Sequence, residues 1–440
     1  MKTINIQETI KCQDSRNVLI QLGAKTINGI GAMVHPTSAN DLQWIFELDY
    51  DHDAIEGIVM PIWMSSQYSA RLNEILNNQK QSTLTGAPNM NSAQSNLFSF
   101  NNTKAILYDP SPEALYFSNK TPEGKEGNIR RVRMKNLISE TGAPKALNDL
   151  LECNPKTYYA AFEKIVNDQK QRNALILWSL IVQNNNKADV VFPMTPYVSG
   201  KETSAFKVAV DMNQEAEILG DSIPTPIGHY YCLDFNFFAD SDTVDVAIEI
   251  FEDQYLKFDK SYKRVVAIKI VNDRFHEEPD SMENLKNFLY ALRKIRDQTG
   301  VVFVLMSAME TGYAGLAKGF DLCSFPTNGY TNVGFSGGNG AVKAGLYDSK
   351  WLSKRKYKSV LKYFKENGHL PVEGTFGMRI AFTDPETYAR DEWNSLAKKV
   401  LAEVKNNEAK KIREAVRDGE VRTIKEKFLG SKRKDFADLF

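Results

Sequence analysis

Three carboxylates stand inside otherwise apolar segments of this chain, where a charged side chain needs a reason to be. Asp109 ends the segment AILYD, Asp234 lies in YCLDFNFF, and Asp321 lies in FDLCSF. A buried charge is costly unless a partner or a function offsets the cost. We therefore take Asp109, Asp234 and Asp321 as candidate catalytic residues. Two carboxylates could divide the roles of nucleophile and acid/base in a displacement reaction.

Each carboxylate also has a structural interpretation, which the sequence leaves open. Asp109 precedes a proline and could form a turn, Asp234 could cap a following helix or pair with Lys269, and Asp321 could form an internal salt bridge. Other polar residues stand at the same predicted strand ends: Thr195, Asn236, Lys269, Asp273 and Ser324. We expect some of these to share a site with the carboxylates.

Thiols, imidazoles and glycines offer weaker signals. Cys323 could be a nucleophile, although a lone buried thiol is usually inert. The four cysteines form no CxxC pair and the five histidines show no metal-ligand spacing, so we expect neither a metal nor a disulfide framework. FSGGNG at 335–340 could cradle a phosphate or form a plain loop, and there is no Walker A or dinucleotide motif, so no cofactor is expected. Scattered thiols and the lack of a signal peptide favour a cytoplasmic protein.

Alternating strands and helices must position these residues. From residue 188 onward the sequence predicts strands at 188–196, 229–238, 264–273, 301–309 and 320–325, with helices near 202–219, 243–258, 281–300 and 311–319. Earlier strands are expected at 57–63 and 105–109, and a helix at 157–183. Continuous apolar runs indicate strands buried on both faces, hence parallel. This order predicts an α/β fold, specifically a (β/α)8 TIM barrel, whose active site lies at the C-terminal ends of the strands.

The predicted organisation has two parts. Residues 1–340 would form the barrel, with loop excursions near 78–103 and 118–145. Residues 341–440 would add a basic-aromatic segment and C-terminal helices packed on the outside of the barrel. No stretch of 18 apolar residues occurs, so no membrane partner is expected.

The net charge is zero, yet positive charge gathers in residues 343–365, which hold eight Lys/Arg and one acid. Lysines and arginines neutralise phosphates, and the interleaved aromatic residues could stack on unpaired bases. An amphipathic helix with a solvated basic face is the alternative. The candidate nucleic-acid-binding residues are Lys343, Lys350, Lys354, Arg355, Lys356, Lys358 and Lys362.

Motif order over most of the chain resembles the tRNA-guanine transglycosylase superfamily, including its branch that inserts 7-deazaguanines into DNA. The similar segments are KKIREAVRDGEVRTIKEKFL at 410–429, Gly319 and Asp321 followed by Pro326 and Thr327, the strand VLMSAM, Ala188-Asp189-Val190-Val191, and Asp109 in AILYDPSPEALYF. The resemblance implies a barrel enzyme that exchanges guanine in tRNA or DNA for a modified base. In that family one Asp attacks the ribose C1′ and a second Asp acts as acid/base.

On this resemblance Asp109 would be the acid/base and Asp234 or Asp321 the nucleophile. Thr195, Asn236, Lys269, Asp273 and Ser324 would bind the base. The chain departs from the family at Ser324, where the family has its nucleophilic Asp. The family's zinc cluster of three Cys and one His is also missing, with the basic-aromatic segment in its place, as are its Gln-Gly-Gly and Gly-Gly-Leu motifs.

Two other functions stay open at this point. A non-catalytic nucleic-acid-binding subunit of the same fold would explain Ser324 and the missing zinc ligands. An unrelated barrel enzyme for a small metabolite is the other alternative. The expected partners are a nucleic acid and a small 7-deazaguanine base, and the sequence leaves a homodimer or a partner subunit undecided.

Overall fold

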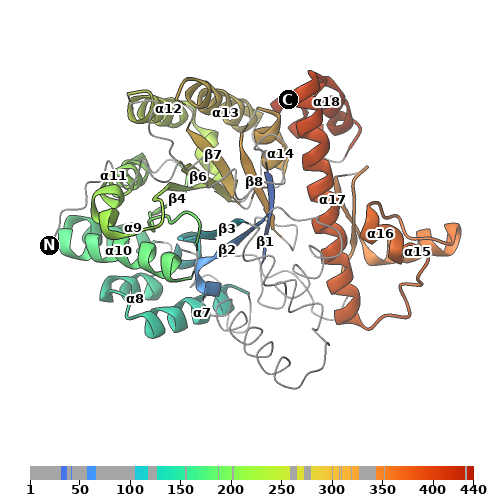
Figure 1. The fold of residues 1–440 in the computed structure, drawn as a ribbon, viewed down its shortest axis with the longest axis horizontal. Helices are drawn as coiled ribbons and strands as arrows, with labels where there is room; N and C mark the ends of the chain where they lie inside the picture. Colours follow the sequence, from blue (N-terminus) through green and yellow to red (C-terminus); the bar gives the residue numbers. More distant parts are fainter. Residues whose placement is uncertain are drawn as a thin grey trace, which may run out of the picture.

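An eight-stranded parallel sheet forms the centre of the molecule in the computed structural model (Figure 1). Its strands are β1 (Gly31–His35), β2 (Gly57–Pro61), β3 (Ala105–Asp109), β4 (Tyr197–Val198), β5 (His229–Asp234), β6 (Val265–Val271), β7 (Val302–Met306) and β8 (Leu322–Pro326). The structure describes residues 31–36, 41, 57–65, 105–116, 126–153, 156–186, 188–200, 203–257, 265–271, 279–299, 301–306, 308, 310–318, 320–326, 343–350, 352–431 and 434–440.

The sheet is curled, and its strand order is β3-β2-β1-β8-β7-β6-β5-β4. Strand β1 pairs in parallel with both β2 and β8, so the first and the last of these strands in the sequence are neighbours inside the sheet. Two isolated parallel bridges, Leu107 with Val190 and Val191 with Ile227, continue the pairing beyond β3. The predicted α/β fold with alternating strands and helices is confirmed, and the curled sheet is compatible with a (β/α)8-like arrangement.

The segment expected to be a strand at 188–196 forms only bridges before the two-residue β4. Pro193 and Pro196 fall inside it and have no N–H to give to a ladder. The buried Gln183 pairs with the backbone of Phe192 instead, accepting from its N–H at 2.9 Å and donating to its carbonyl at 2.6 Å. A helix side chain therefore replaces a neighbouring strand at this point.

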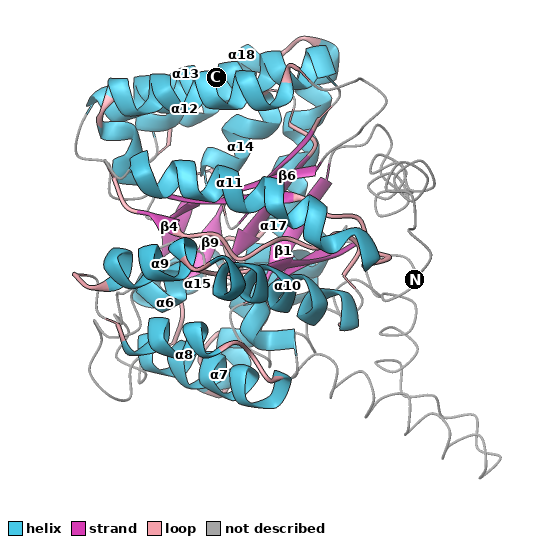
Figure 2. Cartoon of the chain, turned by 90° about the vertical axis from the view of Figure 1, so that its left-hand side faces the viewer, coloured by secondary structure: helices cyan, strands magenta, loops and turns pink. Residues whose placement is uncertain are grey.

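Helices surround the sheet on its outer side (Figures 1 and 2). They are α6 (Glu113–Tyr116), α7 (Glu126–Thr141), α8 (Lys145–Glu152), α9 (Tyr158–Asn167), α10 (Gln169–Asn185), α11 (Thr203–Leu219), α12 (Ser241–Tyr255), α13 (Pro279–Thr299), α14 (Glu310–Ala317), α15 (Tyr357–Asn367), α16 (Thr375–Ile380), α17 (Arg390–Asp418) and α18 (Val421–Leu429).

Some predicted element boundaries were wrong for local reasons. The predicted loop excursion 118–145 contains helix α7, whereas 78–103 lies outside the described residues. The single helix expected at 157–183 is two helices, because the Asp168 side chain accepts from the N–H groups of Lys170 and Gln171 and starts α10. Helix α12 begins after Asp240, which accepts a hydrogen bond from Thr243 at 2.6 Å.

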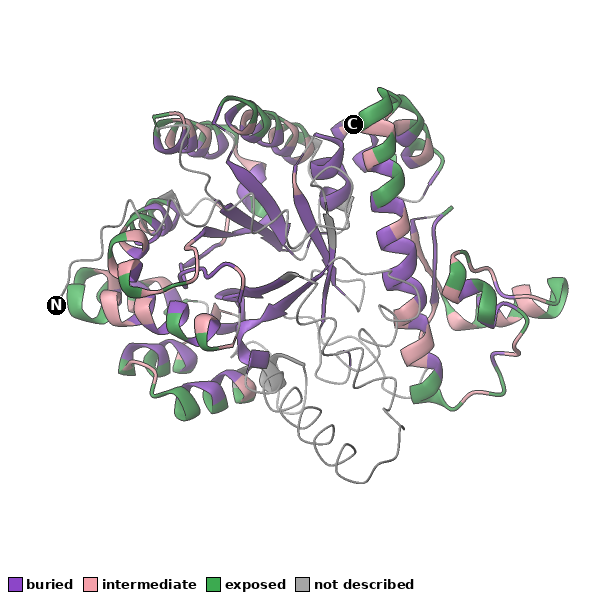
Figure 3. Ribbon diagram, viewed as in Figure 1, coloured by how far each residue is buried: buried purple, intermediate pink, exposed green. Residues whose placement is uncertain are grey.

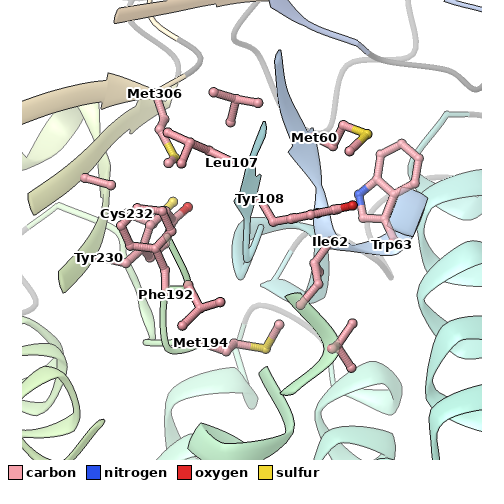
Figure 4. Packing of buried hydrophobic residues seen from close by; sticks show 14 of the residues in the cluster. Met60, Ile62, Trp63, Leu107, Tyr108, Phe192, Met194, Tyr230, Cys232 and Met306 are labelled. Carbon is pink, nitrogen blue, oxygen red and sulfur yellow. The ribbon is translucent and has the colours of Figure 1, made fainter. Parts of the chain in front are cut away.

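Residues alternate between the two faces of each strand, as the pleat requires. Tyr230 and Cys232 face the interior of the curl, and Tyr231 and Leu233 pack under the helices α11 to α13. Figure 4 shows the same alternation on β3, where Leu107 lies toward Met306 while Tyr108 lies toward Ile62 and Trp63. The strands are buried on both faces (Figure 3), which confirms the reason given for expecting a parallel sheet.

The C-terminal helices pack on the outside of the sheet. Helix α17 runs beside α14 and β1, and its Ile412 packs in the cluster that contains Tyr313 of α14, whereas Val400, Leu401 and Val404 pack in a separate cluster with Tyr347. On its other side a hairpin, β9 (Leu346–Asp348) with β10 (Ser353–Arg355), precedes α15 and α16 (Figure 1). No helix among the described residues is long and apolar enough to cross a membrane.

One buried cation ties α17 to three other elements. The ammonium of Lys405 lies 4.7 Å from the ring centre of Tyr313, 5.1 Å from that of Phe325 and 4.8 Å from that of Tyr347. These rings belong to α14, β8 and β9. Such cation–π contacts gain strength when the cation is desolvated, so Lys405 helps to fix the C-terminal helices against the sheet.

Candidate active site

A buried group of charged residues lies at the C-terminal end of β3. The Asp109 side chain is fully buried and accepts hydrogen bonds from the Tyr230 hydroxyl at 2.6 Å and from the backbone N–H of Ser111 at 2.9 Å. The Lys269 ammonium contacts its other oxygen. His35, the last residue of β1, brings Nε2 to 3.6 Å from the same oxygen. Strands β1, β3, β5 and β6 therefore converge on one carboxylate.

A second carboxylate joins the group from helix α6. Glu113 is buried and accepts from Lys269 Nζ at 2.7 Å through one oxygen. Its other oxygen accepts from the Cys232 thiol at 3.5 Å. Lys269 thus lies between two carboxylates, and we call His35, Asp109, Glu113, Tyr230 and Lys269 the Asp109 cluster.

The charges of the Asp109 cluster fix the protonation states of Asp109 and Lys269. Burial alone would raise the pKa of Asp109, but the charges of Lys269 and His35, with hydrogen bonds from Lys269 and Tyr230, lower this pKa to about 2. Burial opposes the charge on Lys269, yet the two carboxylates raise the pKa of Lys269 above its ordinary value. Asp109 is therefore an anion and Lys269 a cation at neutral pH.

Tyr230 and the neighbouring Cys232 thiol keep their protons. Burial, followed by the charge of Asp109, raises the pKa of Tyr230 well above its ordinary value, so this hydroxyl remains a donor. Burial and the charge of Glu113 raise the pKa of Cys232 well above its ordinary value. A thiol is a poor nucleophile in this form, so Cys232 acts as a weak donor here.

Backbone strain marks the turn that follows Asp109. Ser111 has φ of 54°, in the left-handed region that is unfavourable for residues other than glycine. Its N–H donates to the Asp109 carboxylate, and its hydroxyl donates to the Asp109 carbonyl at 3.2 Å. Such strained residues gather at functional sites. The turn aims the carboxylate inward and starts α6 so that Glu113 reaches Lys269.

Asp234 ends β5 on the same inward face as Tyr230, since the two are four residues apart on one strand. It accepts a hydrogen bond from the buried Tyr197 hydroxyl through one oxygen and from the N–H of Asn236 at 2.9 Å through the other. Burial, followed by the charge of Asp234, raises the pKa of Tyr197 well above its ordinary value. Tyr197 is therefore a fixed donor to this carboxylate.

Two further tyrosines hold Tyr197 in place. The Tyr158 hydroxyl accepts from the Tyr197 N–H at 3.3 Å, and the Tyr159 hydroxyl donates to the Tyr197 carbonyl at 2.8 Å. The ring of Tyr116 lies 4.8 Å from the ring of Tyr197. The hydroxyl that serves Asp234 is thus positioned by residues from α6 and α9.

The structure brings together some predicted site residues and separates others. Asp109 and Lys269 are in contact, and Asp234 lies at the same strand ends; it caps the following 3₁₀ turn and is not bonded to Lys269. Asp321 precedes β8, at the opposite edge of the sheet, where Arg296 binds both its oxygens at 3.0 and 3.1 Å. Its structural interpretation is the one observed, and we do not carry Asp321 forward as a nucleophile.

The predicted base-binding residues occupy different depths. Ser324 is buried in the middle of β8 beside Met33, and Thr195 is buried with its hydroxyl donating to the Tyr230 carbonyl at 3.1 Å. Asn236 is exposed just beyond Asp234. Asp273 lies outside the described residues. Asn236 is therefore the predicted base-binding residue with an accessible side chain at this edge.

The predicted nucleic-acid-binding residues of the basic segment also differ in how exposed their side chains are. Lys343 donates to the Pro385 carbonyl at 2.9 Å, and Arg355 pairs with Asp348, so both contribute to the fold of the hairpin and α15. The predicted residues with exposed side chains are Lys350, Lys356, Lys358 and Lys362, and Lys354 is half-buried. The exposed lysines follow the amphipathic alternative, with the aromatic residues Tyr347 and Tyr357 turned to the interior.

Sequence reasoning missed His35, Glu113, Tyr197 and Tyr230 as site residues. Glu113 carried a signal, because it follows Asp109 by four residues across two prolines at a strand-to-helix turn. His35 ends the apolar segment GAMVH, as Asp109 ends its own.

Among the described residues no group of three or more His, Cys, Asp and Glu could hold a metal ion. Searches of protein-family models, curated proteins and solved structures found no match to this chain.

Proposed function

We propose that this chain is a base-exchange enzyme that replaces guanine in tRNA or DNA by a 7-deazaguanine base. The observation that supports it is the pair of carboxylates, Asp109 and Asp234, on the inward face at the C-terminal ends of β3 and β5. Each accepts a hydrogen bond from a buried tyrosine hydroxyl. The order of transglycosylase-like motifs along the chain supports the choice of substrate.

The fold that we propose for this site is a closed (β/α)8 barrel. The bridge from Leu107 to Val190 joins β3 to the segment before β4, and the bridge from Val191 to Ile227 joins that segment to the approach to β5. Farther along the same two segments, Tyr197 of β4 pairs with Cys232 of β5. In a barrel the C-terminal strand ends form the catalytic face.

The chemistry would divide between the two carboxylates. Asp234 would attack C1′ of the ribose, forming a C1′–O bond as the C1′–N bond to guanine breaks and its electron pair leaves with the base. The leaving base needs a proton, which Lys269 holds. The incoming base then attacks C1′ and expels Asp234, and the ionised Asp109 accepts the proton that this base loses and returns it to Lys269. Splitting one displacement into two in this way lowers each barrier.

A second candidate is a non-catalytic nucleic-acid-binding subunit of the same fold. Ser324 favours it, since this serine stands where the resembled family has its nucleophile and is fully buried in β8. The complete burial of Asp109 favours it too, because all the hydrogen bonds of that carboxylate lie within the protein.

The test is incorporation of labelled guanine or a labelled 7-deazaguanine into tRNA and into DNA by the purified chain. We expect incorporation with wild type and a loss of at least about a hundredfold in Asp234→Asn and Asp109→Asn, the range seen for acid/base groups. Tyr197→Phe should lose less, because it removes one hydrogen bond to Asp234.

Asp321→Asn is the comparison variant, since its ion pair with Arg296 lies at the other edge of the sheet. It should retain exchange. Absence of incorporation into any substrate by the folded wild type, with nucleic-acid binding intact, would select the non-catalytic candidate. Exchange lost equally in Asp321→Asn and Asp234→Asn would refute the assignment of the site.

A further inference from the structure

Three rings form a row that ends at an exposed phenylalanine on the far side of α17 from the sheet. The ring of Tyr363 on α15 lies 5.5 Å from that of His369, and the ring of His369 lies 6.4 Å from that of Phe382, both edge to face. Phe382 is 74% exposed, and Met378, one turn before it, is 57% exposed. We call Tyr363, His369 and Phe382 the ring row.

Cations flank the ring row. The Arg355 guanidinium lies over the Tyr363 ring, 5.4 Å from its centre. Lys362, next to Tyr363 in the sequence and on the same helix, is 77% exposed and pairs with Glu366 at 3.7 Å, and Arg379, next to Met378 in the sequence, is exposed. Residues 343–388 as a whole contain nine Lys/Arg and five Asp/Glu. The ring row is therefore an aromatic surface in a locally basic region.

An exposed phenylalanine ring in a basic region matches unpaired nucleic acid better than an apolar protein partner. Every base has a π-face that can stack on an aromatic ring, and the phosphates beside it need positive charge. An apolar protein surface would leave the flanking lysine and arginines facing nonpolar groups, which is unfavourable. A duplex would hide its base faces, so the ring row suits a loop or a single strand.

We propose that the ring row is a docking site for an unpaired segment of nucleic acid, with one base stacked on Phe382 and the adjoining phosphates on Lys362 and Arg379. The inference rests on the proposed function in taking nucleic acid as substrate, and it adds that the bound form is single-stranded here. The site lies on α15 and α16, apart from Asp109 and Asp234 (Figure 1). Binding and exchange can therefore be measured separately.

The experiment is fluorescence anisotropy of the full chain with a labelled oligonucleotide of about twelve unpaired nucleotides and with the matching duplex. We expect the single strand to bind more tightly. Phe382→Ala should weaken single-strand binding roughly 5- to 100-fold, the effect of losing one stacked base. Lys362→Gln should reduce the slope of log affinity against log salt by about 0.7, the contribution of one phosphate.

Lys257→Gln is the matched control, because Lys257, just after helix α12, is 73% exposed and pairs with Asp253 four residues earlier, as Lys362 pairs with Glu366 four residues later. It should leave the salt slope unchanged. Equal single-strand affinity in Phe382→Ala and wild type would overturn the proposal. So would self-association of wild type that Phe382→Ala abolishes, since the ring row would then be an interface between copies. Lost exchange in Asp234→Asn with retained binding concerns the proposed function alone.

Discussion

Replacing Lys269 by methionine would remove the cation that Asp109 and Glu113 share. Methionine keeps most of the side-chain length, so the change leaves little empty space and chiefly deletes the charge. Both carboxylates are buried, and Lys269 itself is only 5% exposed. Removing one partner of a buried ion pair costs about 3–5 kcal/mol, because the remaining charge is left without compensation. We expect a loss of that size in the free energy of unfolding at neutral pH.

The loss should depend on pH with a definite sign. In wild type the pKa of Asp109 is lowered to about 2, so its contribution of about 2.5 kcal/mol is present above the unfolded pKa of 3.8 and is lost as the pH falls toward 2. Without Lys269, burial dominates and raises the carboxylate pKa. Protonation then relieves the buried charge, so the deficit of Lys269→Met should shrink as the pH falls toward about 4.

Urea unfolding of wild type and Lys269→Met near pH 4.5 and near pH 7.5 measures both effects. Lys294→Met is the matched control, because Lys294 forms a 2.8 Å pair with Glu252 on the surface, where both side chains are substantially exposed. It should cost less than about 1 kcal/mol. In Lys269→Met, a loss below about 1 kcal/mol at neutral pH, or a larger loss that does not change with pH, would refute the reasoning.

Two other substitutions test local electrostatics and backbone strain. Burial raises the pKa of Asp189 to about 6 although Ile106 N–H donates to it at 2.7 Å, so its ionisation weakens the fold as the pH rises from about 4 to above 6. Relative to wild type, Asp189→Asn should gain up to about 3 kcal/mol in the free energy of unfolding over that interval, measured by urea titration at several pH values. Gly374→Ala should lower the free energy of unfolding by about 1–3 kcal/mol beyond Gly368→Ala, because its Cβ would clash with the Glu403 carboxylate whereas Gly368 faces open space.

Each of these two expectations has an outcome that contradicts it. A constant difference between Asp189→Asn and wild type from acid to neutral pH would mean that Asp189 titrates normally. Equal destabilisation by Gly374→Ala and Gly368→Ala would mean that positive φ alone matters at Gly374. The Glu403 carboxylate, which accepts from the N–H groups of Phe376 and Gly377 at the start of α16, would then yield to the methyl group at no cost.

Parts of the site could be predicted from the sequence, because each of these residues stands in a recognisable local pattern. Asp109 and Asp234 are charges at the ends of apolar strands, and Lys269 is a charge within one, so burial of these groups was predictable. Asp321 gave the same signal and has a different setting. It comes before its strand, at the N-terminal edge, and the partner that satisfies it is Arg296 on helix α13, which precedes the neighbouring strand β7. Strand direction separates the two cases, and a one-residue error in the strand boundary hides it.

The sequence by itself determined the α/β alternation, the parallel sheet and the apolar stripe of α17, because hydrophobic periodicity and continuous apolar runs are local properties. Only the tertiary structure decided which partner each buried charge has. Asp109 is paired with Lys269, 160 residues farther along the chain, and with Tyr230, 121 residues away. No local pattern encodes such pairings, since they arise from the curl that brings β1, β3, β5 and β6 to one point. The Asp109 cluster is thus a property of the curl of the sheet, and its members come from these four strands and from helix α6.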